Sequence, residues 1–273
     1  MKRIVDIKDV QRELFSALCY FDDFCRKENI TYFLSNGTLL GAVKYGKFVP
    51  WDDDVDLLLP REDYDKLVAL SSINNDSYRL FCREQVPEWR MPYAKFSCEN
   101  TLVEEGEYDF GARFGLSVDI FPIDTWSACR SVAKLQAVRS DLLKRLLVCS
   151  IGGDFKTRKS GVKKFILKSV WRRGKRLGHQ RILKKISRAV EKSKTRRKKY
   201  AGCLAWTCHG SGEVLPVEIF EPSVGILFCG REFPTFKGYE AYLDSLYGAW
   251  REELPPDKQH SNHEIKAWWR NAE

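Results

Sequence analysis

Apolar and polar residues recur along this chain with two periods, which separate the expected helices from the expected strands. Residues 7–28 place apolar side chains three and four positions apart among charged ones, which predicts a helix with one buried face. Similar spacing predicts helices over 61–70, 132–148 and 239–248. Short apolar or alternating runs between turn residues predict strands at 31–35, 54–59, 79–82, 93–97, 102–104, 116–121, 214–220, 225–229 and 232–236. The fold class expected from this mixture is α+β (α/β).

Basic residues are concentrated in the middle of the chain. Of the 46 Lys and Arg residues, 20 lie within 155–200 together with one of the 37 acidic residues, so this stretch carries +19 and the remainder −10. Apolar residues recur there at near-helical spacing, which predicts basic amphipathic helices inserted between two parts of an acidic body. We therefore expect a core over 1–150, a basic helical insertion over 151–201 and a C-terminal part over 202–273 that completes the core.

The insertion is compatible with several partners. An anionic membrane surface or a polyanionic glycan suits basic amphipathic helices, and a merely solvated helical face is the plainer alternative. Nucleic acid would recognise a similar charge pattern, but no nucleic-acid-binding motif accompanies it, so nucleic acid is disfavoured.

The bulk composition predicts a cytoplasmic protein. The 273 residues contain no run of eighteen apolar residues and no secretion signal at the N-terminus. The nine cysteines are odd in number and scattered, which favours reduced thiols. Cys203, Cys208 and His209 form a local cluster whose spacing fits no common zinc site, so buried thiols are the preferred interpretation.

The most unusual stretch of the chain is acidic. Asp52, Asp53, Asp54 and Asp56 fall within five positions, directly before an apolar segment that ends at Pro60. Carboxylates at this density repel one another unless a cation neutralises them. On a strand, Asp54 and Asp56 would point to the same side and could hold a divalent cation such as Mg²⁺ or Mn²⁺. Asp52 would support these two ligands without binding the ion directly, and Asp53 would be a cap or a solvated charge.

Two further charged residues interrupt apolar strands. Asp119 lies within the run 116–121, where an ionised carboxylate is costly unless it is paired or bound to a cation, so we predict it as a third metal ligand. A carboxylate that caps a loop or pairs with Lys95 or an arginine is the alternative. Lys95 itself could neutralise a phosphate or could face water on an edge strand.

A glycine-containing turn precedes the acidic stretch. After the strand at 31–35, Ser35, Asn36 and Gly37 form a turn and Thr38 lies in the first turn of a helix. Backbone N–H groups and the positive end of a helix dipole at such a turn can bind a phosphate.

These motifs together resemble the LicD family. The resemblance is carried by Gly37-Thr38-Leu39-Leu40-Gly41-Ala42-Val43, by Phe48-Val49-Pro50-Trp51-Asp52-Asp53-Asp54-Val55-Asp56 and by Val118-Asp119-Ile120-Phe121-Pro122-Ile123-Asp124. Weaker similarity extends to the C-terminus, where Lys258, His260 and His263 match the family pattern poorly. The resemblance implies a nucleotidyltransferase-like mixed sheet flanked by helices. Lys95 also matches a lysine position of the family.

The resemblance implies transfer of phosphocholine, or a related phosphoalcohol, from a CDP-activated donor to a hydroxyl of a cell-surface glycan or its lipid-linked precursor, with release of CMP. Asp54, Asp56 and Asp119 would hold the metal ion, and one of them, Asp119 first, would accept the hydroxyl proton. Residues 35–38, Asp52 and Lys95 would bind the nucleotide phosphates. Trp51, Tyr93 and Trp89 are candidates for an aromatic cage around the choline.

Other functions remain open at this point. Nucleotidyl transfer and pentitol-phosphate transfer use the same kind of fold. A glycan-binding relative without activity is a further possibility. A calcium-binding loop is suggested by Asp52, Asp54, Asp56 and Asp63, but Leu57 occupies the position where such loops require glycine.

Overall fold

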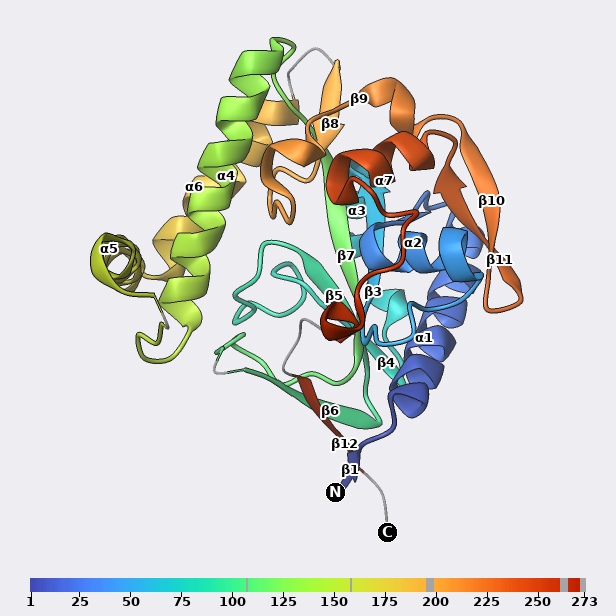
Figure 1. Cartoon of the computed structure of the whole chain (residues 1–273). Coiled ribbons are helices and arrows are strands. Elements are labelled where there is room, and N and C mark those ends of the chain that lie inside the picture. The colour runs from blue at the N-terminus through green and yellow to red at the C-terminus, as the bar shows by residue number, and fades with distance from the viewer. Residues whose placement is uncertain (107, 158, 195–198, 261–264, 271–273) are drawn as a thin grey trace.

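The computed structural model describes residues 1–106, 108–157, 159–194, 199–260 and 265–270 (Figure 1). A mixed sheet forms the centre, with the order β2-β3-β7-β5-β4 and two short strands, β8 and β9, attached to the end of β7. Its strands are β2 (Phe33–Leu34), β3 (Val55–Pro60), β4 (Tyr78–Phe81), β5 (Ala94–Cys98), β7 (Ser117–Thr125), β8 (Tyr200–Gly202) and β9 (Leu215–Pro216). Only β3 and β7 pair in parallel among these described strands. The predicted α+β class is confirmed.

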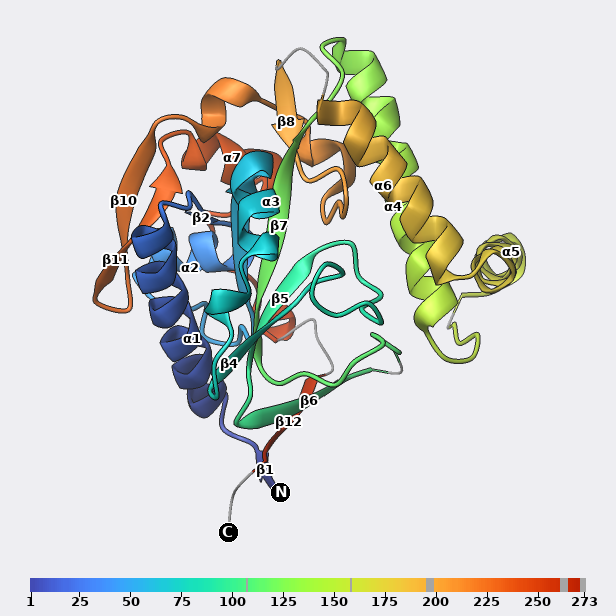
Figure 2. The same cartoon turned by 180° about the vertical axis from the view of Figure 1, so that it is seen from behind.

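Helices cover both faces of this sheet. Helices α1 (Ile7–Glu28) and α3 (Arg61–Ala69) lie on one face, and α2 (Asn36–Tyr45) and α7 (Tyr239–Tyr247) on the other (Figures 1 and 2). The helix predicted over 7–28 is confirmed, because its regularly spaced apolar residues are buried against the sheet, where Phe21 packs on Phe96. The second face, beneath α2 and α7, is the one that carries the charged residues considered below.

Two smaller sheets complete the body. The hairpin of β10 (Ser223–Phe228) and β11 (Arg231–Phe236) confirms two predicted strands. A three-stranded sheet pairs β12 (Ile265–Trp269) with both β1 (Lys2–Ile4) and β6 (Thr101–Glu105). The strand predicted over 214–220 is mostly wrong, because Val217–Phe220 form a 3₁₀ turn and only β9 is extended. Further 3₁₀ turns are Ser71–Ile73, Gly210–Glu213 and Pro256–Lys258.

Three long helices lie beside the sheet. They are α4 (Arg130–Ile151), α5 (Gly161–Leu177) and α6 (His179–Lys194), so the predicted basic helices are present. Helix α5 approaches α4 closely at Gly174, where a Cβ would lie 2.6 Å from the carbonyl oxygen of Leu146. Helix α6 buries four aliphatic side chains and is tied to α3 by the ion pair of Lys194 with Asp65. Helix α5 lies at the outer edge of the molecule (Figure 1).

Candidate active site

Three charged residues form a row across the central sheet. Asp56 of β3 is the register partner of Asp119 on β7, and Asp119 is the register partner of Lys95 on β5. Register partners on adjacent strands point to the same face of a sheet, and their strands are about 4.8 Å apart. The acidic stretch and Asp119 therefore meet on one face, as the sequence predicted.

Lys95 and Asp119 form an ion pair inside the protein. The Lys95 Nζ atom lies 2.7 and 2.9 Å from the two carboxylate oxygens of Asp119. The side chains are 7% and 14% exposed, so water screens the pair only weakly. The alternative of a water-facing edge lysine is wrong, because β5 lies between β4 and β7. The alternative in which Asp119 pairs with Lys95 is confirmed.

The pKa of Asp56 is raised by its surroundings. Burial raises its pKa well above the ordinary value, and the negative charges of Asp54, Asp119 and Asp52 raise it further, while Lys95 opposes them. These four carboxylates therefore act on one another electrostatically, although Asp52 and Asp54 precede the strand. A divalent cation would relieve this repulsion.

Metal binding by Asp54, Asp56 and Asp119 remains a prediction. Asp54, Asp119 and Lys95 line a cavity of about 30 Å³, which is roomy enough for a single ion or water molecule. Among the described residues, however, no group of three His, Cys, Asp or Glu side chains is close enough to hold a metal ion. The donor chemistry fits a hard cation such as Mg²⁺, but both oxygens of Asp119 now bind Lys95.

The calcium-loop alternative is wrong. The segment that would supply the second half of such a loop, Val55–Pro60, is the inner strand β3, and Leu57 and Leu59 are fully buried there. Such a strand cannot wrap its backbone around an ion.

The predicted helix after β2 is confirmed, but it begins at Asn36, so Asn36 and Gly37 belong to its first turn and not to a preceding turn. Ser35 occupies the N-cap position of α2, and Asn36 adopts a positive φ of 44°, a conformation that asparagine tolerates better than most residues. The Tyr242 hydroxyl of α7 donates to the Asn36 side chain at 2.7 Å and holds it there. The Asp56 backbone N–H donates to the Thr38 hydroxyl at 2.9 Å, so the turn is bonded directly to the acidic strand.

The start of α2 has two features relevant to binding. The Ser35 hydroxyl is fully buried and has no hydrogen-bond partner among the described atoms. A Cβ added to Gly37 would lie 2.7 Å from Asp52 Oδ2, so this carboxylate faces the helix start. The Gln11 side chain donates to the Asp52 carbonyl oxygen at 2.9 Å and fixes the loop. Phosphate binding by residues 35–38 remains a prediction.

The three aromatic candidates differ in position. Trp89 is 1% exposed and packs on Phe81 and Phe110, so its assignment to a choline cage is wrong. Tyr93 lies beside the row, with Lys95 Nζ 5.9 Å from its ring centre. Trp51 is half-buried in the turn that leads to the acidic stretch.

Several site residues were missed because they come from distant segments. Trp206 packs on Tyr93 with ring centres 5.3 Å apart. Burial raises the pKa of the Tyr247 phenol well above its ordinary value, and the charges of Asp56, Asp52 and Asp54 add to this, which places Tyr247 of α7 near the acidic cluster. His209 contacts Tyr247 at 4.9 Å between ring centres. No sequence signal marks Trp206 or Tyr247, and His209 was considered only with Cys203 and Cys208 as a disfavoured zinc site, since only the tertiary fold brings these residues here.

Glu213 holds the loop that carries His209. Its carboxylate accepts the backbone N–H groups of Cys208 and His209, and burial raises its pKa to about 7. Cys203 is a buried thiol, as preferred from the sequence, whereas Cys208 is exposed, so the interpretation is wrong for that residue; all nine cysteines are free. Lys258 lies in an exposed turn, and His263 falls outside the described residues.

Comparisons with known proteins agree with this geometry. A family model described as "LicD/FKTN/FKRP, nucleotidyltransferase domain" matches residues 29–137, which include the α2 turn, the acidic strand, Lys95 and Asp119. The protein named lipopolysaccharide cholinephosphotransferase LicD, from Haemophilus influenzae, is 24% identical over 97% of this chain and 98% of its own length. Uncharacterized proteins of Rickettsia prowazekii and Rickettsia typhi are 49% identical over 37 residues, which cover 14% of this chain and 14% and 12% of theirs.

Residues 29–137 therefore form a domain similar to the nucleotidyltransferase domain of the LicD, FKTN and FKRP proteins. Over nearly its whole length the chain is also similar to a protein named as a cholinephosphotransferase. Within the described residues, no helix is both long and apolar enough to span a bilayer.

Proposed function

We propose that this protein transfers phosphocholine from CDP-choline to a hydroxyl group of lipopolysaccharide or another cell-surface glycan, or of its lipid-linked precursor, and releases CMP. The near full-length similarity to the H. influenzae enzyme supports the choice of phosphocholine and glycan. The observation that carries the proposal is the row of Asp56, Asp119 and Lys95, which joins anionic and cationic groups on one sheet face. A cytoplasmic location, where all nine free thiols would stay reduced, is part of the proposal.

The row suits phosphoryl transfer because such reactions depend on charge stabilisation and positioning. Asp54, Asp56 and Asp119 would hold Mg²⁺ or Mn²⁺, which would neutralise the donor phosphates and the departing CMP oxygen. Lys95 orients Asp119 through its two hydrogen bonds and adds a positive charge beside the phosphates. A carboxylate of the row accepts the proton of the attacking hydroxyl.

The start of α2 binds the nucleotide side of the donor in this proposal. The buried Ser35 hydroxyl supplies an unused hydrogen-bonding group, and the backbone N–H groups of residues 36–38 lie at the positive end of the helix dipole. Because Asp52 faces the same helix end, it positions the turn rather than binding the phosphate directly.

The choline group requires an aromatic surface. Tyr93 packs on Trp206 and lies beside Lys95, and Trp51 is half-buried directly before the acidic stretch in the chain. Aromatic faces attract quaternary ammonium groups through their electron-rich rings. We assign choline recognition to Trp206 and Trp51, which are half-buried. Tyr93 is only 5% exposed, so it supports the Trp206 ring instead of contacting the ligand.

The test is a donor panel with purified protein, Mg²⁺ and a lipopolysaccharide acceptor. CDP-choline, CDP-ribitol, CDP-glycerol, ATP and CTP are compared for release of CMP or pyrophosphate. CMP release that is greatest with CDP-choline and requires the acceptor supports the proposal. Pyrophosphate release from a nucleoside triphosphate would instead indicate nucleotidyl transfer, which the wording of the family description favours as the second candidate. Preference for CDP-ribitol or CDP-glycerol would indicate transfer of another phosphoalcohol.

A further inference from the structure

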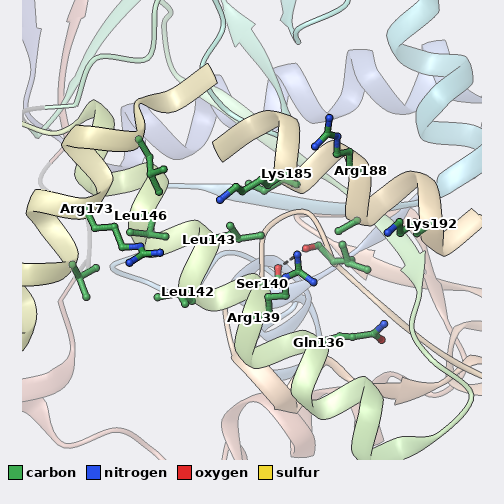
Figure 3. Close-up of a pocket in the computed structure, with 15 residues that line it drawn as sticks. Gln136, Arg139, Ser140, Leu142, Leu143, Leu146, Arg173, Lys185, Arg188 and Lys192 are labelled. Carbon is green, nitrogen blue, oxygen red and sulfur yellow. Dashed lines mark hydrogen bonds between the residues drawn. The ribbon is translucent and has the colours of Figure 1, made fainter. Parts of the chain in front are cut away.

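A large groove lies between α4, α5 and α6, away from the acidic row. Its volume is about 650 Å³, and its walls are mainly aliphatic, with Leu143, Leu146 and Val170 among them. The charged residues that border it are all basic: Arg139, Arg173, Lys185, Arg188 and Lys192 (Figure 3). An apolar channel bordered by cations is complementary to an amphiphile with an acyl chain and an anionic head group.

Exposed apolar side chains extend from this groove along two helices. On α4, Leu135, Val138 and Leu142 are 68%, 61% and 47% exposed, and Leu142 also lines the groove. Their spacing of three and four residues places them on one helix face. This face is continuous with the groove.

The first half of α5 carries a second exposed stripe. Val162, Phe165 and Ile166 are 75%, 72% and 54% exposed, and Val170, one turn further along, lines the groove. Helix α5 contacts α4 near Gly174, so its first half projects beyond this crossing. Large apolar side chains clustered on a surface mark a site of interaction.

The charge of these helices indicates which kind of partner they bind. Helix α5 contains seven Lys or Arg and no acidic residue, and α6 contains six and one acid. Basic residues interleaved with exposed Phe, Ile, Leu and Val are typical of helices that lie at an anionic membrane surface. A nucleic-acid interface would explain the cations but not the exposed aliphatic stripes.

We propose that the surface formed by α4, α5 and α6 binds anionic phospholipid bilayers peripherally. The apolar stripes enter the acyl region, and the basic residues around the groove bind lipid phosphates. This inference does not rest on the proposed function, because its test uses neither donor nor acceptor. Failure of membrane binding would therefore leave the transfer reaction untouched, and failure of transfer would leave the membrane site untouched.

The apolar part is tested by sedimentation of the full-length protein with vesicles of phosphatidylcholine and phosphatidylglycerol in equal parts, or of phosphatidylcholine alone. The wild type should bind only the anionic vesicles. Ile166→Asp should weaken this binding about tenfold, since an exposed apolar group of the interface becomes a charge. The matched control is Leu227→Asp, because Leu227 on β10 is 59% exposed and lies outside the surface; it should bind like the wild type.

The basic part is tested with two triple variants of equal net charge. Lys185→Glu, Arg188→Glu and Lys192→Glu together should abolish binding, whereas Lys8→Glu, Lys27→Glu and Lys237→Glu, at exposed positions elsewhere, should reduce it less than threefold. Equal losses in both triple variants would show an effect of net charge alone and overturn the proposal. Unchanged binding by Ile166→Asp, or tighter binding to RNA than to anionic vesicles, would overturn it as well. Circular dichroism and thermal unfolding confirm that each variant is folded.

Discussion

Lys95 Nζ binds both carboxylate oxygens of Asp119, at 2.7 and 2.9 Å, across two neighbouring strands of the central sheet. Asp119 in turn lies beside Asp56 on the parallel strand β3. The pair explains how a chain can place an acid in the middle of an apolar strand: its charge is matched by a lysine on the next strand. The same arrangement leaves Asp56 with an excess of negative neighbours.

Removing the lysine from this pair should cost stability as well as activity. Lys95→Met leaves a largely buried carboxylate without its cation, which should lower the free energy of unfolding by about 3 kcal/mol. Urea denaturation measures the change, with Arg79→Met, at an exposed position on β4, as control. The double variant Lys95→Met with Asp119→Leu should regain most of the stability and remain inactive. A single variant as stable as the wild type would contradict the ion pair.

Both acids of the row should be required for transfer, and of the two only Asp119, the partner of Lys95, should also contribute to stability. Asp56→Asn and Asp119→Asn should each lower kcat by about 10³-fold or more, because they remove charge from the phosphoryl-transfer site. Initial rates of CMP release measure the effect. Asp76→Asn, at an exposed position before β4, is the control and should retain full activity. Asp56→Asn should not destabilise the protein, since it removes the repulsion from the neighbouring acids.

The contact between Gly37 and Asp52 gives a prediction about the α2 turn. Gly37→Ala places a methyl group 2.7 Å from Asp52 Oδ2 and must displace this carboxylate, which should lower kcat/KM by about 100-fold. In an Asp52→Ala background the same glycine change should have less than a twofold effect, because the clash is gone. Equal effects of Gly37→Ala in both backgrounds would assign the loss to something other than Asp52.

Glu213 should make stability dependent on pH near neutrality. Burial raises its pKa from 4.5 to about 7, so between these values the unfolded chain is ionised while the folded protein still carries the proton. The free energy of unfolding should therefore fall as the pH rises from 5 to 8. Glu213→Gln cannot ionise, so the wild type should lose about 2 kcal/mol relative to this variant across that range. Urea denaturation of both proteins at the two pH values measures the difference, and a constant difference would contradict the raised pKa.

The parts of the fold that follow local rules could be predicted from the sequence. Helix α1 shows a clear period of apolar residues and strand β3 a short continuous apolar run, and both form close to the expected positions. Strand β12 was not predicted, because its pairing with β1 and β6 depends on contacts between opposite ends of the chain. The segment 214–220 was taken as a strand because its apolar residues resemble one, although Val217–Phe220 turn instead.

The residues of the candidate site could likewise be predicted only in part. The meeting of Asp56 and Asp119 could be expected, since an unpaired acid in a buried strand demands a partner or a cation. Tyr247, His209 and Trp206 could not, because they lie on α7 and in the loops before it, and nothing local shows that these segments fold over β3 and β7. Trp89 was misassigned because closeness in sequence does not reveal whether an aromatic ring faces a ligand or the core.

The most direct test of the account is mass spectrometry of a glycan acceptor incubated with CDP-choline, Mg²⁺ and either the wild type or Asp56→Asn. With the wild type, the acceptor should gain one phosphocholine for each CMP released, and removal of Mg²⁺ by EDTA should stop the reaction. The variant should leave the acceptor unmodified while remaining folded. Equal modification by the wild type and by Asp56→Asn would contradict the assignment of the acidic row as the transfer site.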